Sequence, residues 1–391
     1  MTPPRILVVD DEPAILRSVE RVLSPPYHVV CTHSPKEAVG LADTFEPDLV
    51  ILDIRMPEMD GFELMGRIRA ARSDLEIILM TGSVRELDAQ LTRALREKAF
   101  YFLQKPFDRE VLQTLVGRCL DLRRLEKENQ RHLKRLEQEL AEARAFQQSM
   151  LPPEQGWVGG ISIAARYQPS AELGGDFYDY VAVGQDGGTL LVADVSGHGA
   201  SAAMLTGVVK SAFHSASAEG YEPLCIVARV ANGIQTFSFD RFITLICVRI
   251  SASQSLLEYV NAGHPPGILW GAGRDPTLME ATGPLISPAL LNSSWKQETL
   301  RFRSQDRLLL FTDGIEDVDG DRGYFGLGGI VREVTQNPEG GACLLDRILS
   351  SVREFTGGRR IHDDLTLLTA DRGSTEVLSQ ERAQATNSAA Y

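Results

Sequence analysis

The first third of the chain alternates short apolar runs with longer amphipathic stretches. The apolar runs are ILVVD (6–10), HVVC (28–31), LVILD (49–53), EIILMTG (76–82) and FYFLQKP (100–106). This alternation is typical of βα units that build a parallel sheet. We therefore predict an α/β domain over residues 1–120.

A long charged helix is predicted after this domain, because residues 118–151 contain neither Gly nor Pro. Lys, Arg, Asp and Glu make up 13 of the 24 residues from 121 to 144. A three-four apolar spacing, interrupted by Asn129, forms a narrow seam of the kind that pairs with a second helix. We expect residues 121–150 to form a coiled-coil linker that joins a parallel homodimer; a single solvated helix is the alternative. The seam residues are Leu122, Leu133, Leu136, Leu140 and Ala143.

Residues 151–371 return to strand-like runs, separated by turn signals and by helical stretches at 201–216 and 223–236. The runs are ISIAARYQP, TLLVADVSG, RFITLICVRI, LLEYVNAG, DRLLLFTDG and DDLTLLTA. This mixture predicts an α+β domain rich in sheet. The polar tail, residues 372–391, is expected to be disordered.

Length and composition agree with a folded, aqueous protein. At about 150 residues per domain, 391 residues suggest two or three domains. The net charge of −13 opposes binding to nucleic acid or to anionic lipid. Five scattered cysteines without a CxxC pair argue against zinc knuckles and a disulfide framework. No export signal or membrane-spanning run occurs, so we expect a cytoplasmic protein without a membrane partner.

Acidic residues gather at the ends of the predicted parallel strands. Asp10 and Asp11 end the first run and Asp53 the third, so their carboxylates are expected to share one pocket. Their mutual repulsion favours a bound Mg²⁺. Asp53 then becomes a candidate to attack a phosphoryl donor, with Thr81 and Lys105 binding the phosphate oxygens.

A second acidic set lies in the C-terminal region, beside glycines that we interpret as tight turns. Such monodentate carboxylates suit Mg²⁺ or Mn²⁺, whereas zinc would call for His and Cys. Two metals that share a carboxylate lower the pKa of a bridging water, which is suited to phosphate-ester hydrolysis. The motifs are GGDFYD (Asp176, Asp179), ADVSGHG (Asp194), FTDGIED (Asp313, Asp317) and HDDLT (Asp363, Asp364).

The segments VVDDE, LDIRMPEMDGFEL, LMTG and LQKPF resemble the receiver domain of two-component response regulators. The resemblance implies a doubly wound, flavodoxin-like fold with five parallel strands. It also implies that Asp53 is phosphorylated by a sensor histidine kinase or a phosphotransfer protein. The Mg²⁺ ligands that it implies are Asp10, Asp11, Asp53 and the Arg55 carbonyl. The switch positions that it implies are Thr81, Phe102 and Lys105.

The order GGDFYD, ADVSGHG, FITL, NAGHPP, TDGIE, DDLT resembles the bacterial PPM phosphatases of the SpoIIE and RsbU type over residues 143–371. The resemblance implies a β-sandwich flanked by helices and two Mn²⁺ or Mg²⁺ ions. Asp194 would bridge the ions. One site would be completed by Asp176 and the Val195 carbonyl, and the other by Asp313 with Asp363 or Asp364.

Three further residues were weighed for a role near the metals. His198 is a candidate hydrogen-bond donor or general acid toward the leaving seryl oxygen, with a turn histidine as the equal alternative. His264, held in a turn by two prolines, is expected to be structural. Cys247 is expected to be a buried strand residue.

The leading hypothesis is a response regulator whose phosphorylation at Asp53 controls a metal-dependent serine/threonine protein phosphatase. The segment ARAFQQSMLPP (143–153) resembles the family's junction between signalling helix and phosphatase, which offers a mechanical link. The resemblance suggests a STAS-type anti-anti-sigma factor as the substrate. The alternative is a non-catalytic adaptor that binds a sigma factor or its regulator through the phosphatase-like domain.

Overall fold

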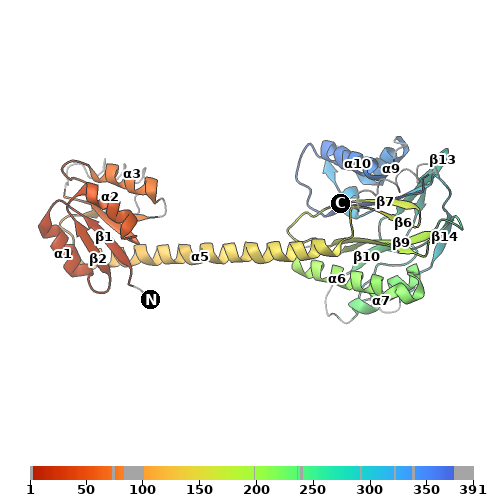
Figure 1. Ribbon diagram of the computed structural model, residues 1–391, viewed down its shortest axis with the longest axis horizontal. Helices are drawn as coiled ribbons and strands as arrows, with labels where there is room; N and C mark the ends of the chain where they lie inside the picture. The colour runs from red at the N-terminus through yellow and green to blue at the C-terminus, as the bar shows by residue number, and fades with distance from the viewer. Residues whose placement is uncertain are drawn as a thin grey trace. The chain divides into compact units, whose positions relative to one another are not determined.

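The computed structural model describes residues 3–72, 75–82, 101–197, 199–235, 237, 241–290, 293–320, 323–336 and 340–373. The chain forms two compact units, Met1–Leu136 and Glu137–Tyr391, whose folds are drawn in Figure 1. Among the described residues, no helix has both the length and the apolar character needed to cross a bilayer.

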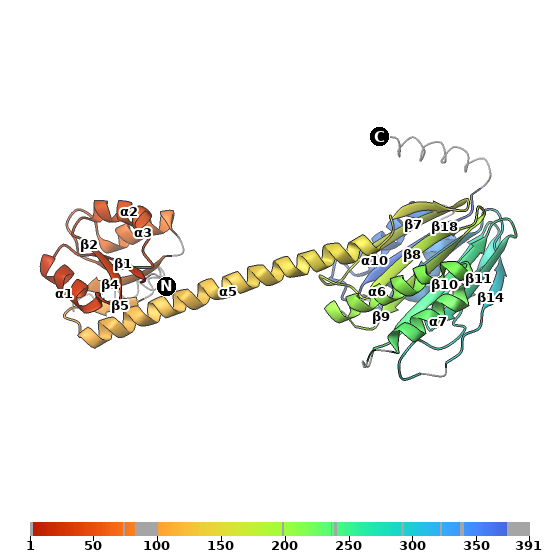
Figure 2. The same ribbon diagram turned by 60° about the horizontal axis from the view of Figure 1, so that its bottom comes forward.

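The first unit contains the predicted sheet of five parallel strands, in the order β2-β1-β3-β4-β5. Its helices lie on both faces of the sheet, as expected for a doubly wound fold (Figures 1 and 2). The strands are β1 (Arg5–Val9), β2 (His28–Thr32), β3 (Leu49–Asp53), β4 (Glu76–Thr81) and β5 (Tyr101–Gln104). The helices are α1 (Pro13–Leu23), α2 (Pro35–Thr44), α3 (Gly61–Ala71) and the start of α5 (Arg109–Met150).

Along the central strands, successive apolar side chains point to opposite faces of the sheet, and each face is covered by a layer of helices. Leu7 and Val9 of β1 enter the core cluster that contains residues of α2 and α3. Ile6 and Val8 enter the cluster that contains residues of α1 and α5. Successive strand side chains point to opposite faces, so a strand that is covered on both sides reads as a continuous apolar run.

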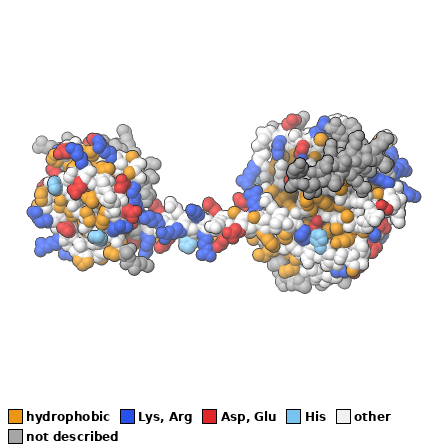
Figure 3. All heavy atoms as spheres, in the orientation of Figure 1, with side chains coloured by type: hydrophobic (Ala, Val, Ile, Leu, Met, Phe, Trp, Pro, Cys, Tyr) orange, Lys and Arg blue, Asp and Glu red, His pale blue; other side chains and the backbone are white. Residues whose placement is uncertain are grey.

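Helix α5 spans 42 residues without a break and passes through Gly117. Its first turns bury Leu112 and Val116 in the receiver core. Beyond them, charged side chains of both signs cover the helix (Figure 3). Five leucines between residues 122 and 140 are 41–55% exposed. They are Leu122, Leu125, Leu133, Leu136 and Leu140.

The second unit is built on two sheets, as the sheet-rich sequence predicted. One has the order β14-β11-β10-β9-β8 and the other β13-β12-β15-β18-β7-β6. The strands of the first are β8 (Asp176–Val183), β9 (Gly187–Val195), β10 (Ile243–Ser251), β11 (Leu256–Ala262) and β14 (Glu298–Arg301). Those of the second are β6 (Gln155–Val158), β7 (Ile161–Gln168), β12 (Gly267–Gly271), β13 (Arg274–Met279), β15 (Arg307–Phe311) and β18 (Leu365–Asp371).

Helices cover the outer faces, which completes a sandwich of four layers. Leu190 and Val192 of β9 lie in the core between the sheets. Leu191 and Ala193 of the same strand pack on the other face, under α6 and α7 (Figure 2). The remaining elements are α6 (Ala200–Ser215), η1 (Ala216–Glu219), α7 (Pro223–Ile234), α8 (Asp313–Glu316), β16 (Asp319–Gly320), β17 (Gly323–Tyr324), α9 (Gly326–Gln336) and α10 (Gly341–Phe355).

Two local interpretations were wrong. We placed Asp176, Asp179 and Asp194 in tight turns, but Asp176 begins strand β8, Asp179 lies within it, and Asp194 lies near the end of strand β9. The run DFYDY that follows the glycines contains three aromatic residues, which fit a half-buried strand. Cys247 is fully buried in β10, as predicted.

Candidate functional site

The receiver site lies where the parallel strands end. Asp10 follows β1, Asp53 ends β3, Thr81 ends β4 and Lys105 follows β5. Since parallel strands end at the same edge of a sheet, these side chains come together. The Lys105 ammonium lies 2.6 Å from Asp10 Oδ2 and 2.6 Å from Asp53 Oδ1. The structure therefore places a buried cation between two buried carboxylates.

Backbone amides fix the outer oxygens of the same carboxylates. The amide of Glu12 donates to Asp10 Oδ1 at 3.0 Å, and the amide of Arg55 donates to Asp53 Oδ2 at 2.9 Å. Burial raises the pKa of Asp53, although the hydrogen bond and charge of Lys105 oppose this shift. Burial also disfavours the Lys105 ammonium, but its two carboxylate partners outweigh burial and raise its pKa.

The other predicted receiver residues surround this pair of carboxylates. Asp11 is half-buried next to Asp10, and Thr81 is buried. Phe102 is partly buried and packs against the core cluster on the α2 and α3 side. Oxygen donors gathered at one sheet edge fit a hard divalent cation such as Mg²⁺.

The second site brings four distant segments to one end of the sandwich. Asp176 and Asp194 are cross-strand partners on β8 and β9. Asp313 begins α8, just after β15, and Asp363 and Asp364 precede β18. Strands β15 and β18 are hydrogen-bonded neighbours, so the last three aspartates also lie at a shared edge.

Two buried threonines hold Asp176. Thr312 Oγ1 and Thr366 Oγ1 donate to Asp176 Oδ2 at 2.7 and 2.6 Å, and both threonines are fully buried. Thr366 also donates its amide to Thr312 Oγ1 at 3.0 Å. These bonds join the two sheets at the acidic end. Sequence reasoning missed both threonines, although each lies inside a motif that it singled out, FTDGIED and HDDLT.

Asp364 is held by backbone amides. Ser170 donates its amide to Asp364 Oδ1 at 2.7 Å, and Gly175 donates to Oδ2 at 2.6 Å. Asp363 differs, since it is exposed and its Oδ1 accepts the amide of Asp364 at 2.8 Å. The two neighbouring aspartates therefore have different surroundings: one fastens the loop before β8, and the other faces solvent.

Burial and the repulsion between neighbouring carboxylates raise the pKa values of three aspartates in this site. Burial raises the pKa of Asp194 to about 7, and the charges of Asp313, Asp363 and Asp364 add to the shift. Burial also raises the pKa of Asp176 far above its ordinary value, helped by Asp194 and opposed by the threonine bonds. The pKa of Asp313 is raised by burial and by Asp363. Such a set is unfavourable when ionised unless cations accompany it.

The donor set fits hard cations in its chemistry. All five side chains supply carboxylate oxygens, which Mg²⁺ and Mn²⁺ prefer. Within the described ranges, no three His, Cys, Asp or Glu side chains converge closely enough to hold an ion as they stand. His198 lies outside the described residues.

The end of α5 contacts the loop that leads to Asp176. The sequence indicated such a junction only through the ARAFQQSMLPP motif. Gln147 is 6% exposed and makes two hydrogen bonds to Gly174, the residue two positions before Asp176. Its Nε2 donates to the Gly174 carbonyl at 2.7 Å, and its Oε1 accepts the Gly174 amide at 3.2 Å. Lys210 of α6 donates to the Met150 carbonyl at 2.6 Å and to Asp179 at 3.1 Å.

His264 has the structural role that we expected. It is 4% exposed, and its Nδ1 lies 2.8 Å from Thr244 Oγ1. Asn261 accepts the His264 amide at 2.8 Å and donates to its carbonyl at 3.0 Å. Burial lowers the pKa of His264 to about 3, so the ring is neutral.

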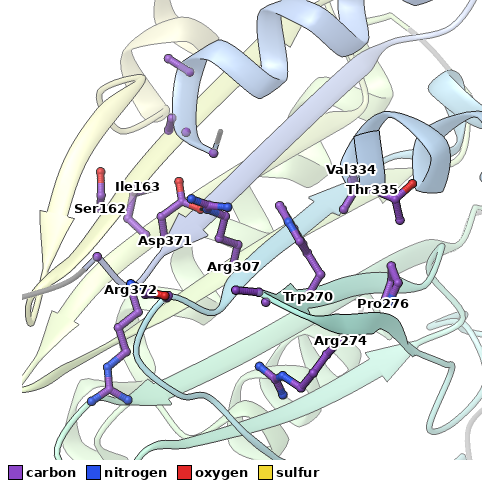
Figure 4. A pocket seen from close by; sticks show the side chains of 18 of the residues that line it. Ser162, Ile163, Trp270, Arg274, Pro276, Arg307, Val334, Thr335, Asp371 and Arg372 are labelled. Carbon is purple, nitrogen blue, oxygen red and sulfur yellow. The ribbon is translucent and has the colours of Figure 1, made fainter. Parts of the chain in front are cut away.

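A pocket of about 1170 Å³ lies elsewhere in the second unit (Figure 4). Its described lining includes Trp270, Arg307 and Asp371 and none of the five carboxylates of the acidic site. Arg307 pairs with Asp371 across it at 3.7 Å. The pocket is thus separate from the acidic chemistry.

Comparisons with known proteins agree with both domains. Residues 6–117 match the family described as "Response regulator receiver domain", and residues 185–373 match "Stage II sporulation protein E (SpoIIE)". The chain is 27% identical over 216 residues to phosphoserine phosphatase RsbP of Bacillus subtilis, which covers 54% of this chain and 52% of RsbP. It is 38% identical over 123 residues to response regulator MprA of Mycolicibacterium vanbaalenii, which covers 31% of this chain and 51% of MprA.

A solved structure supports the fold of the second unit. The SiaA-PP2C domain of Pseudomonas aeruginosa aligns with a TM-score of 0.54 at 20% identity, over 61% of this chain and 98% of that domain. The chain spans about half the length of RsbP and of MprA. The chain therefore carries a response regulator receiver domain over residues 6–117 and a SpoIIE-type PPM phosphatase domain over residues 185–373.

Proposed function

We propose that this chain is a two-component response regulator in which phosphorylation of Asp53 controls a metal-dependent serine/threonine protein phosphatase. The observation that carries the proposal is that Asp176, Asp194, Asp313 and Asp363 all lie at one end of the sandwich, in a domain that matches the SpoIIE family. RsbP, a relative over this region, is by name a phosphoserine phosphatase.

In the receiver, Asp53 accepts the phosphoryl group from a sensor histidine kinase or a phosphotransfer protein. Asp10, Asp11, Asp53 and the Arg55 carbonyl hold Mg²⁺, which neutralises charge when bound. Lys105 already contacts Asp53 Oδ1 at 2.6 Å, so its ammonium is in place to bind a phosphate oxygen. Thr81, at the end of the neighbouring strand, supplies a hydroxyl, and Phe102 changes packing with it.

In the phosphatase domain, Asp194, Asp176, Asp313, Asp363 and the Val195 carbonyl would hold two metals, with Asp194 shared between them. When bound, Mn²⁺ or Mg²⁺ would supply a water of lowered pKa and neutralise phosphoryl oxygens. The Thr312 and Thr366 hydroxyls orient Asp176 and favour its ionised form, because they donate to Oδ2. His198 remains a proposed donor toward the leaving oxygen.

Asp363, rather than Asp364, is proposed as the direct ligand. Both oxygens of Asp364 already accept backbone amides, so binding a metal would break or share these bonds. Asp363 has an exposed carboxylate that is available to move. In this assignment Asp364 is a positioning residue that holds the loop before β8.

Helix α5 is proposed to transmit the signal. It is one continuous element from the receiver core to Met150. Its Gln147 holds Gly174, and Met150 accepts from Lys210, which also binds Asp179. A rotation of the helix would therefore move the start of β8 and change the position of Asp176.

The exposed leucines of α5 support the proposed homodimer. Leu133, Leu136 and Leu140 are spaced by three and four residues and are 52%, 55% and 41% exposed. Covering such a stripe with the same helix of a second copy buries apolar surface. Asn129 would then fix the register at some cost in stability.

The proposed substrate is a phosphoserine or phosphothreonine protein, and we retain a STAS-type anti-anti-sigma factor as its class. The support is the similarity to RsbP and the SpoIIE family. The substrate class is separable from the activity, since a phosphatase can act on a generic ester.

The deciding experiment measures hydrolysis of p-nitrophenyl phosphate by the purified chain with Mn²⁺, with and without beryllofluoride. Metal-dependent turnover that changes with beryllofluoride in wild type, but not in Asp53→Ala, supports the regulated enzyme. Absence of turnover in a protein that binds Mn²⁺ would instead favour the adaptor.

A further inference from the structure

Arg241 lies just before β10, beside the segment that follows Asp194 on β9. The two strands continue to pair there: Ser196 donates its amide to the Phe242 carbonyl at 2.9 Å, and Phe242 donates its amide to Ser196 Oγ at 2.9 Å. The Arg241 guanidinium donates from Nη1 to the Ser196 carbonyl, and from Nη2 to Ser201 Oγ at 2.7 Å. These bonds hold the guanidinium against Ser196, which lies two positions after Asp194, the proposed bridging ligand.

The backbone beside Asp194 leaves space for this guanidinium. Gly197 has a φ of +82°, and a Cβ there would clash with Arg241 Nη1. A Cβ at Gly175, the residue before Asp176, would approach the Gly197 carbonyl to 3.0 Å. Arg241 is thus packed at the rim of the acidic site.

The charge of Arg241 is not cancelled by its described partners. Both of its hydrogen bonds go to neutral oxygen atoms. By contrast, Arg166 pairs with Asp346 at 2.8 Å and Arg229 pairs with Glu219 at 2.8 Å. A guanidinium has five N–H donors in a planar fork that matches a phosphoryl group. Two of them are used here.

Two exposed apolar side chains belong to the two segments that the Arg241–Ser201 hydrogen bond joins. Phe242 follows it in sequence and is 38% exposed. Met204 is 75% exposed and lies three residues after Ser201, on the same face of α6 as this partner of Arg241. Large side chains in such exposure, next to a cation, suit a peptide segment better than a small ester.

We propose that Arg241, Phe242 and Met204 receive the phosphorylated segment of the protein substrate. Arg241 binds the phosphoryl group, and Phe242 and Met204 contact apolar residues on either side of the phosphoserine. This inference rests on the proposed function. It adds a surface that selects phosphoproteins with apolar residues next to the phosphorylated position.

The first test compares Arg241→Ala and Arg241→Lys with wild type, using p-nitrophenyl phosphate and a phosphoserine peptide. Loss of a charged hydrogen-bond donor is expected to raise KM for both by about 10- to 100-fold, with less effect for Lys. The half-saturating Mn²⁺ concentration should stay within about twofold, because Arg241 does not bind metal. Arg229→Ala, which removes a paired arginine, is the matched control.

The second test uses two phosphoserine peptides that differ only in leucine or glycine beside the phosphoserine. Phe242→Ala and Met204→Ala should each raise KM for the leucine peptide by about 3- to 10-fold. They should leave KM for the glycine peptide and for p-nitrophenyl phosphate unchanged.

Several results would overturn the inference. One is a wild-type KM in Arg241→Ala for both substrates. Another is a rise in half-saturating Mn²⁺ that accounts for all lost activity, since Arg241 would then only position the loop. If Phe242→Ala and Met204→Ala raise KM equally for the leucine and the glycine peptide, these side chains do not contact the residue beside the phosphoserine. Wild type without any Mn²⁺-dependent turnover would instead overturn the proposed function itself.

Discussion

The two acidic sites of this chain balance their charge differently. In the receiver, the buried Lys105 ammonium lies 2.6 Å from both Asp10 and Asp53. In the phosphatase domain, the described partners of Asp176 and Asp364 are threonine hydroxyls and backbone amides, all neutral. The receiver thus carries a cation of its own chain, whereas no described hydrogen-bond partner of Asp176 or Asp364 carries a charge.

This difference suggests that a bound metal ion would stabilise the second site more than the receiver site. A lysine between two carboxylates lets the receiver fold with its acidic pocket largely neutralised, and leaves the lysine to bind a phosphate later. Repelling carboxylates, by contrast, store unfavourable energy that metal binding relieves. Proton and metal should therefore compete at the second site.

The largest expected effect comes from removing the shared ligand of the second site. Asp194→Asn should lower Mn²⁺-dependent turnover of p-nitrophenyl phosphate by at least about 1000-fold, since metal-assisted stabilisation contributes several kcal/mol. Asp186→Asn changes an exposed aspartate of the same domain and should retain wild-type turnover. Residual activity above a few per cent in Asp194→Asn would show that this carboxylate does not bridge the metals.

The next largest effect is expected when the receiver loses Lys105, whose charge offsets the two buried carboxylates. Lys105→Met leaves two buried carboxylates without their ammonium and should destabilise the receiver by about 3–5 kcal/mol at pH 7.5. Hydrogen exchange of the β1 and β3 amides measures this loss. Without Lys105, no ammonium opposes the burial that raises the pKa of Asp53, so the destabilisation should grow as pH rises and fade near pH 4.

A compensating substitution sharpens this test. Lys105→Met with Asp10→Asn leaves one buried carboxylate in place of two, and should recover part of the lost protection. Equal protection in wild type and Lys105→Met would contradict the role of Lys105 in neutralising the pocket.

A smaller effect concerns the link between the sites. Gln147→Ala leaves the buried Gly174 amide and carbonyl without their partners, which should cost about 1–3 kcal/mol locally. We expect turnover to become insensitive to beryllofluoride. Gln148→Ala is the matched control, because this neighbouring glutamine is exposed. An unchanged beryllofluoride response in Gln147→Ala would rule out this residue as the link.

The smallest expected effect is the pH dependence of metal binding. The pKa of Asp194 is about 7 in the metal-free site, and a protonated carboxyl must lose its proton to bind metal. Half-saturating Mn²⁺ should therefore rise by about five- to sixfold from pH 7 to pH 6, and level off above pH 8. Turnover measured against Mn²⁺ at pH 6, 7 and 8 checks this. A constant value across this range would contradict competition between proton and metal.

The sequence by itself determined the local elements and the residue types of both sites. Continuous apolar runs such as LVILD predict strands that are covered on both faces, and β3 is fully buried. The acidic residues at strand ends predict the receiver pocket, since parallel strands share an edge. Periodicity and composition act over a few residues, so a chain read locally reveals them.

Only the tertiary structure decided which groups hold the acidic residues. Thr312 and Thr366 reach Asp176 across 136 and 190 positions of the chain, and Gly175 reaches Asp364 across 189. It also distinguished Asp363 from Asp364, which are alike in sequence. Such contacts depend on sheet register and on the packing of two sheets, which no short pattern encodes. For the same reason the sequence showed Gln147 only as part of a helix end, and the fold placed it against Gly174.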